Sequence, residues 1–266
     1  YNNFFNHSVS GASIEDYIAI TGAYESFHGY LPSTIIFGID PWIFNKYNGQ
    51  RRWRSIQNYY DYQLINIYGK ELNNNTNDFA INTIKFKQLI NFDYSISNLK
   101  FFIRSLLNSE GKKFYVVDSF EIDDFVRVND GSIHYPFNIR HRKNDKVKEF
   151  AIKFVTEGAP YSLAKFNDLS NVQLFEDFVK YLKYQNVDVI FLLPPYNPIT
   201  YDLLEKNTKY KNISIVEEYL NTFAKLHDFD LVGSYNPKKL GLTSDDFFDG
   251  VHSRDSVLRN FFQSFL

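Results

Sequence analysis

Residues 187–193, VDVIFLL, form a run in which every side chain except Asp188 is apolar. A short run of this kind, rich in β-branched residues, is typical of a strand covered on both faces of a parallel sheet. Residues 34–39, TIIFGI, have the same character. The first run stops at Pro194 and the second at Asp40 with a proline behind it, so they predict two buried strands of one sheet.

Helical segments alternate with these strands. Ser13 followed by Asp16 has the spacing of a capping box and opens a predicted helix whose apolar face begins at Ile14. Further helices are expected over 55–68, 86–107, 174–182 and 216–223, and further strands over 1–9 and 229–233. The alternation predicts an α/β fold, a three-layer α/β/α sandwich with a mainly parallel, flavodoxin-like sheet, in a single domain over residues 1–266.

One stretch breaks this alternation. Residues 114–117, 126–128 and 133–135 are predicted to form short strands, with a hairpin turn at Asp130-Gly131. They indicate a small β-rich insertion at about 112–156, which would cover or shape a site. His134 and His141 lie in it without carboxylates at a metal-binding spacing, so we predict no metal, and no cofactor is predicted either.

The composition argues against several classes of protein. The 266 residues include 29 basic and 31 acidic side chains, a formal net charge of −2, which argues against a nucleic-acid partner. No run approaches ~18 apolar residues, so no membrane span is predicted. Cysteine is absent, which removes disulfides, thiolate metal sites and a cysteine nucleophile. Methionine is absent even at residue 1, so we hypothesise that the chain is a fragment of a longer product or that modified methionines are missing from the sequence.

Asp249 and His252 are spaced so that both can serve one proton transfer. A carboxylate three residues before an imidazole, on a turn entering a helix, can hold one ring nitrogen and leave the other free to accept a proton. Gly250 allows a tight backbone between them, and Ser253 or Asp255 can cap the helix that follows. The alternative is that Asp249 only caps that helix and His252 is a surface histidine.

Other candidates follow the predicted strands, at the edge where open α/β sheets bind ligands. Gly11, preceded by Ser10, permits close backbone approach there, and an ordinary turn is the alternative. Asp40 can bind substrate hydroxyls, orient a partner or simply terminate its strand. Tyr196 and Asn197 are candidates for substrate contact, with a rigid proline-rich turn as the alternative.

Residues 233–256, GSYNPKKLGLTSDDFFDGVHSRDS, resemble the last block of the SGNH (GDSL-type) hydrolase superfamily, in which Asp-x-x-His supplies two members of a Ser-His-Asp triad. The run is most similar to extracytoplasmic polysaccharide and teichoic-acid acyl-transfer proteins of that superfamily. The resemblance implies that Gly11 lies where a glycine N–H helps to hold an oxyanion. It also implies that Asp40 replaces an asparagine, and an ionised aspartate cannot donate the hydrogen bond that an asparagine donates.

The resemblance further implies a serine in a first block, Gly-Asp-Ser or Gly-Ser-Ser, which this sequence does not contain. We therefore expect that serine, its central strand and a membrane anchor upstream of Tyr1. A parallel sheet without its central strand leaves backbone groups unpaired, so the residues alone are not expected to fold well. Within the chain only Ser10 and Ser13 are candidates for the nucleophile, and both suit turn and cap positions better.

Three functions are compatible with these features. The first is a serine esterase or O-acyltransferase that acts on acyl esters, acetyl above all, of a cell-surface glycan, in the periplasm or at the cell surface. The second is a non-catalytic relative that binds a glycan or a membrane acyltransferase partner. A serine within hydrogen-bond reach of His252 would support the first function, and any other residue there would refute it. The third is a flavodoxin-like nucleotide binder, for which residues 10–13 make a poor phosphate turn.

Overall fold

The computed structural model describes residues 4–69 and 116–263. The chain divides into two compact units, one made of Tyr1–Ile67 with Glu121–Leu266 and the other of Tyr68–Phe120. The first unit holds every candidate site residue named above. The helix predicted over 86–107 and the first half of the strand predicted over 114–117 lie outside the described residues.

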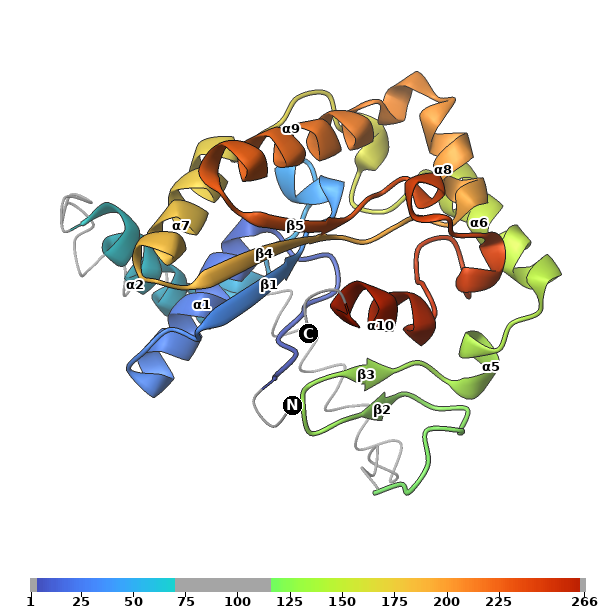
Figure 1. Cartoon of the computed structure of the whole chain (residues 1–266), viewed down its shortest axis with the longest axis horizontal. Helices are drawn as coiled ribbons and strands as arrows, with labels where there is room; N and C mark the ends of the chain where they lie inside the picture. The colour runs from blue at the N-terminus through green and yellow to red at the C-terminus, as the bar shows by residue number, and fades with distance from the viewer. Residues whose placement is uncertain (1–3, 70–115, 264–266) are drawn as a thin grey trace, which may run out of the picture. The chain divides into compact units, whose positions relative to one another are not determined.

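A small parallel sheet lies at the centre of the first unit (Figure 1). Its strands are β1 (Thr34–Gly38), β4 (Asp188–Leu193) and β5 (Asp230–Gly233), in the order β1-β4-β5. The register places Ile36 opposite Ile190, and Leu192 opposite Val232. The mixed α/β class and the parallel strands predicted from the two apolar runs are therefore confirmed.

Residues 4–9, predicted as part of a strand, have no regular secondary structure. The backbone N–H of Asn6 donates to the carbonyl of Asp130 in the hairpin loop, 2.5 Å away. The Asn6 side chain accepts from the Ser8 N–H and closes a local turn. These backbone groups are therefore engaged in a turn and a loop contact and do not extend the sheet.

Local chemistry explains where helix α1 begins and ends. Helix α1 starts with a complete capping box between Ser13 and Asp16 and stops at Gly29, whose φ of 76° suits glycine. The helices and 3₁₀ turns up to β4 are α1 (Ile14–His28), η1 (Pro41–Phe44), η2 (Arg52–Ile56), α2 (Gln57–Tyr68), α5 (Phe137–Arg140), α6 (Asn144–Thr156), η3 (Leu163–Lys165) and α7 (Val172–Tyr184). Those after β4 are α8 (Pro198–Glu205), η4 (Thr208–Tyr210), α9 (Asn212–His227), η5 (Pro237–Leu240), η6 (Ser244–Asp246) and α10 (Asp255–Gln263).

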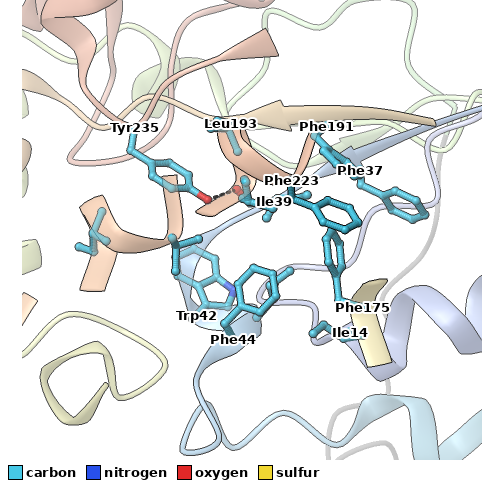
Figure 2. Packing of buried hydrophobic residues seen from close by; sticks show 14 of the residues in the cluster. Ile14, Phe37, Ile39, Trp42, Phe44, Phe175, Phe191, Leu193, Phe223 and Tyr235 are labelled. Atoms are coloured by element: carbon cyan, nitrogen blue, oxygen red, sulfur yellow. Dashed lines mark hydrogen bonds between the residues drawn. The ribbon is translucent and has the colours of Figure 1, made fainter. Parts of the chain in front are cut away.

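Aromatic side chains from strands and helices form the core (Figure 2). Phe191 of β4 packs on Phe175 of α7, with ring centroids 5.5 Å apart, and on Phe223 of α9, at 6.4 Å. Burying a ring of this size stabilises the fold by roughly 2–3 kcal/mol. Tyr235, just after β5, donates its hydroxyl to the Ile39 carbonyl at 2.9 Å and so ties the segment that leaves β5 to the end of β1.

The predicted β-rich insertion at 112–156 is only partly made of strands. Strands β2 (Val126–Arg127) and β3 (Ile133–His134) pair antiparallel, as the hairpin pattern predicted. The rest of its described part includes the helices α5 and α6. Helix α6 forms because Val147 and Ala151, four residues apart, turn to the interior while Glu149 pairs with lysines on the outer face. Within the described part of the chain, no helix combines the length and apolar character needed to cross a bilayer.

Candidate functional site

The Asp249 carboxylate holds the turn that carries His252. Its Oδ2 lies 2.8 Å from Nδ1 of the imidazole, and its Oδ1 accepts the backbone N–H groups of Val251 at 2.9 Å and His252 at 2.8 Å. Helix α10 begins only at Asp255, so the alternative in which Asp249 caps that helix is wrong. Because the carboxylate accepts from Nδ1–H, the neutral imidazole has a bare, accepting Nε2.

The electrostatic setting keeps Asp249 ionised. Burial alone would raise its pKa, but the hydrogen bond from His252, the charge of that ring and the two backbone amides outweigh it and hold the pKa below the ordinary value. The Asp249 side chain is 18% exposed, whereas that of His252 is 46% exposed. The pair therefore combines a fixed, shielded carboxylate with an imidazole that solvent and ligands can reach.

Asn197 anchors this turn to the end of β4. It is fully buried, its N–H donates to the Gly250 carbonyl at 3.0 Å, and its Nδ2 donates to the Asp249 carbonyl at 3.2 Å. Its Oδ1 caps α8 by accepting the Ile199 N–H. The prediction that Asn197 contacts substrate is therefore corrected: its side chain is committed to holding the Asp249 turn in place.

Gly250 allows the turn to lie close to helices α6 and α8. An added Cβ would meet Thr200 Oγ1 at 2.9 Å and the Cβ of Phe154 at 3.0 Å, closer than such atoms approach one another. Thr200 itself is fixed, because its hydroxyl donates to the Ala151 carbonyl. The tight backbone predicted at Gly250 thus has a steric cause.

Tyr135 occupies the position next to the free nitrogen of His252. Its hydroxyl lies 3.2 Å from Nε2, and its ring centroid lies 5.1 Å from the centroid of the imidazole. Phe248 also stacks on the imidazole, with its ring within 6° of parallel, and contacts the Tyr135 ring as well. Sequence reasoning missed Tyr135, and the hairpin prediction next to it was the only available signal. Among the hydrogen bonds of the described residues, none joins a serine to His252.

Asp40 is a second carboxylate within electrostatic reach of His252. It follows β1 and makes no capping hydrogen bond to η1. Burial raises its pKa to about 7, and the positive charge of His252 only partly offsets this. The predicted position at the carboxyl end of the strand is therefore correct, and of the three roles considered, orienting a charged partner is compatible with this proximity.

Tyr196 lies beside Asp40 but is buried, with 2% of its surface exposed. Its hydroxyl finds no partner among the described residues, and burial together with the charge of Asp40 raises its pKa well above the ordinary value. The prediction that Tyr196 contacts substrate is therefore also corrected, because a buried side chain offers no surface to a ligand.

Ser10 and Gly11 lie against a different ring, that of Tyr161. The Ser10 hydroxyl is 3.4 Å from the Tyr161 hydroxyl, and an added Cβ at Gly11 would stand 2.2 Å from the Tyr161 ring. Tyr161 has a positive φ of 56°, a strained conformation that Asn45 supports by donating to its carbonyl. The role of Gly11 at an oxyanion stays a prediction.

No three His, Asp or Glu side chains of residues 4–69 and 116–263 gather into a set that could hold a metal ion. Comparison of the chain with protein-family models, with curated proteins and with solved structures finds no match. The chemistry of the site is therefore the ground for proposing a function.

Proposed function

We propose that this chain is an ester hydrolase or O-acyltransferase of the SGNH kind, in which His252 is the general base and acid and Asp249 orients it. The observation that carries the proposal is the 2.8 Å contact between Asp249 Oδ2 and His252 Nδ1, on a carboxylate that two backbone amides already fix. An imidazole held in this way takes a proton from a hydroxyl nucleophile and returns it to the leaving group.

The surroundings of His252 favour a role as a general base over a role in stabilising the fold alone. Asn197 and Gly250 hold the turn from behind, while the imidazole keeps nearly half of its surface exposed. Two carboxyl groups with oppositely shifted pKa values act electrostatically on this imidazole: the pKa of Asp40 is raised and that of Asp249 is lowered. Carboxyl groups whose surroundings push their pKa values apart are characteristic of acid and base catalysis.

The remaining parts of the proposal follow from the resemblance over 233–256. They are an acyl ester of a cell-surface glycan as substrate, with acetyl as the preferred group, and a location outside the cytoplasm on a membrane-anchored protein. For the fold, we propose the three-layer sandwich with a flavodoxin-like sheet, in which a further strand pairs with the outer strand β1.

A non-catalytic protein that binds a glycan or a membrane acyltransferase partner is the second candidate. One observation favours it: the hydroxyl at Nε2 of His252 belongs to Tyr135 and not to a serine. In that case the exposed ring of His252 would contact the ligand without chemistry.

The test is the reaction of the full-length protein with a fluorophosphonate, followed by intact mass and peptide mapping. The proposal predicts one adduct on a hydroxyl side chain, formed by the wild type and by His28→Ala, which removes an exposed histidine of α1. His252→Ala should slow its formation by roughly 100-fold or more, the usual contribution of a general base.

The absence of any adduct that depends on His252, in a protein that still binds acetylated cell-surface oligosaccharides by calorimetry, would contradict the enzyme and favour the binding protein. Thermal unfolding of each variant checks that the substitutions leave the fold intact.

A further inference from the structure

A hydroxyl group already stands at the free nitrogen of His252. The Tyr135 oxygen lies 3.2 Å from Nε2, and Nδ1 of the same ring lies 2.8 Å from Asp249. The three groups form one continuous chain of carboxylate, imidazole and hydroxyl. In such a chain the imidazole removes the proton of the hydroxyl as its oxygen attacks an electrophile.

Several contacts fix the position of Tyr135. The Arg140 guanidinium donates from Nε to the Tyr135 carbonyl at 2.8 Å. The phenol ring packs between Phe125 and Phe248, whose centroids lie 5.4 and 5.3 Å away. Phe248 in turn stacks on the imidazole. The hydroxyl is therefore held toward Nε2 by its backbone and by two rings, and does not depend on the hydrogen bond alone.

The phenol is protonated and donates to the imidazole. Burial and the charges of Asp249 and Tyr161 raise the pKa of Tyr135 above its ordinary value, so a free phenolate is disfavoured. The Tyr135 O–H therefore points its proton at the bare Nε2, which is the starting arrangement for base-assisted attack. A phenol still loses its proton to a base far more easily than an aliphatic hydroxyl does.

We propose that Tyr135 is the catalytic hydroxyl of this site and carries the acyl group covalently between donor and acceptor. This inference rests on the proposed acyl-transfer function, and it names as nucleophile a tyrosine of the described chain where the resemblance implied a serine. The hairpin made by β2 and β3 then does more than cover the site, because it supplies the reacting atom.

The chemistry of a phenol selects the donor. The Tyr135 oxygen bonds to the carbonyl carbon of a thioester, its proton moves to Nε2, and the carbon–sulfur bond breaks as the thiolate leaves and takes that proton. An acceptor alcohol then gives its proton to Nε2 and attacks the tyrosyl ester, and the phenolate leaves and regains the proton. An aryl ester is at least as high in free energy as a thioester and well above an alkyl ester. The second step therefore draws the first forward, and the overall transfer from a thioester to an alcohol runs downhill. Attack of Tyr135 on an alkyl ester would run uphill, so a tyrosine nucleophile takes its acyl group from an activated donor and corresponds to the acyltransferase form of the proposed function.

The experiment exposes the full-length protein to S-acetyl-N-acetylcysteamine, a small acetyl thioester, without an acceptor alcohol. Acetylated positions are located and timed by peptide mass mapping. We expect Tyr135 to be acetylated at least about 100-fold faster in the wild type than in His252→Ala, as for other base-assisted attacks. Tyr184, whose side chain is highly exposed, serves as the internal reference for unassisted acetylation. Tyr135→Phe should lose the fast acetylation and leave the rate at Tyr184 unchanged.

Three results would overturn the inference. An acetyl group that depends on His252 but sits on a serine would refute the role of Tyr135 and leave the proposed function standing. Acetylation of Tyr135 at the same rate with and without His252 would show that the pair does not activate it. No acetylation that depends on His252, together with no fluorophosphonate adduct, would refute both the inference and the proposed function.

Discussion

Two carboxylates interact electrostatically with His252, and their surroundings differ. Asp249 accepts three hydrogen bonds and its pKa is lowered, whereas Asp40 receives no hydrogen bond to its carboxylate from the described residues and its pKa is raised to about 7. Both are removed from water to some degree. Burial raises the pKa of both carboxyl groups, and at Asp249 the hydrogen-bond donors and the charge of His252 outweigh it, so Asp249 stays ionised at neutral pH.

The difference also predicts opposite responses to pH. The stability that Asp249 contributes is present above its unfolded value of 3.8 and is lost as the pH falls through its lower folded pKa. The stability that Asp40 contributes is present at acidic pH, where the folded state keeps its proton, and is lost as the pH rises toward and past 7. Asp249 is thus an anion that orients the imidazole, whereas Asp40 can exchange a proton near neutral pH.

The largest effect is expected from Asp249→Asn, which removes the orienting charge. The amide can still accept from the two backbone N–H groups, so the turn persists, but its NH₂ group opposes the tautomer with a bare Nε2. The rate of fluorophosphonate labelling that depends on His252 should fall by about 10³-fold or more. The matched control is Asp245→Asn, an exposed carboxylate on η6. Equal labelling by the two variants would show that Asp249 does not orient the base.

Asn197→Ala removes the support beneath the same turn. The variant leaves the Asp249 carbonyl and the start of α8 without their partners, so the free energy of unfolding should fall by about 1–3 kcal/mol in urea denaturation. Asn221→Ala, which loses one hydrogen bond to the Glu217 carbonyl on the exposed side of α9, should cost less than about 1 kcal/mol. A similar loss of unfolding free energy in both variants would show that Asn197 does not support the Asp249 turn more than an ordinary surface hydrogen bond supports its helix.

Gly250→Ala adds one methyl group where Phe154 and Thr200 leave no space. We expect a loss of about 1–3 kcal/mol in unfolding free energy, as for other overpacked sites. Gly38→Ala is the control, because an added Cβ there meets nothing within 4 Å. If Gly250→Ala were as stable as Gly38→Ala, the close approach of the turn to α6 and α8 would be refuted.

The last prediction concerns Asp40, whose carboxylate accepts no hydrogen bond from the described residues. Asp40→Asn keeps the shape of the side chain and removes the proton equilibrium. Relative to the wild type, the variant should gain stability in urea denaturation as the pH rises from about 4 to 8, because above 3.8 the unfolded wild type gives up a proton that its folded state keeps up to about pH 7. A difference that does not change over this pH range would show that the pKa of Asp40 is not raised.

Local features were predictable from the sequence, and long-range ones were not. The apolar runs of β1 and β4, the capping box of α1 and the contact between Asp249 and His252 each depend on residues a few positions apart. The Tyr135 hydroxyl lies 117 residues from His252 along the chain, and no periodicity or spacing joins them. Asn197 was recognised as a site residue, but its role was misjudged, because only tertiary packing shows that its side chain is buried beneath the turn.

The central claim is that Asp249 holds His252 with a proton on Nδ1 and leaves Nε2 free to act on a hydroxyl. Long-range ¹H–¹⁵N NMR of the histidine rings at neutral pH tests it most directly, with His252→Gln to assign the signals of that ring. The structure predicts that the neutral ring of His252 carries its proton on Nδ1 in the wild type and loses that preference in Asp249→Asn. A neutral ring protonated on Nε2, or one that Asp249→Asn leaves unchanged, would contradict the claim.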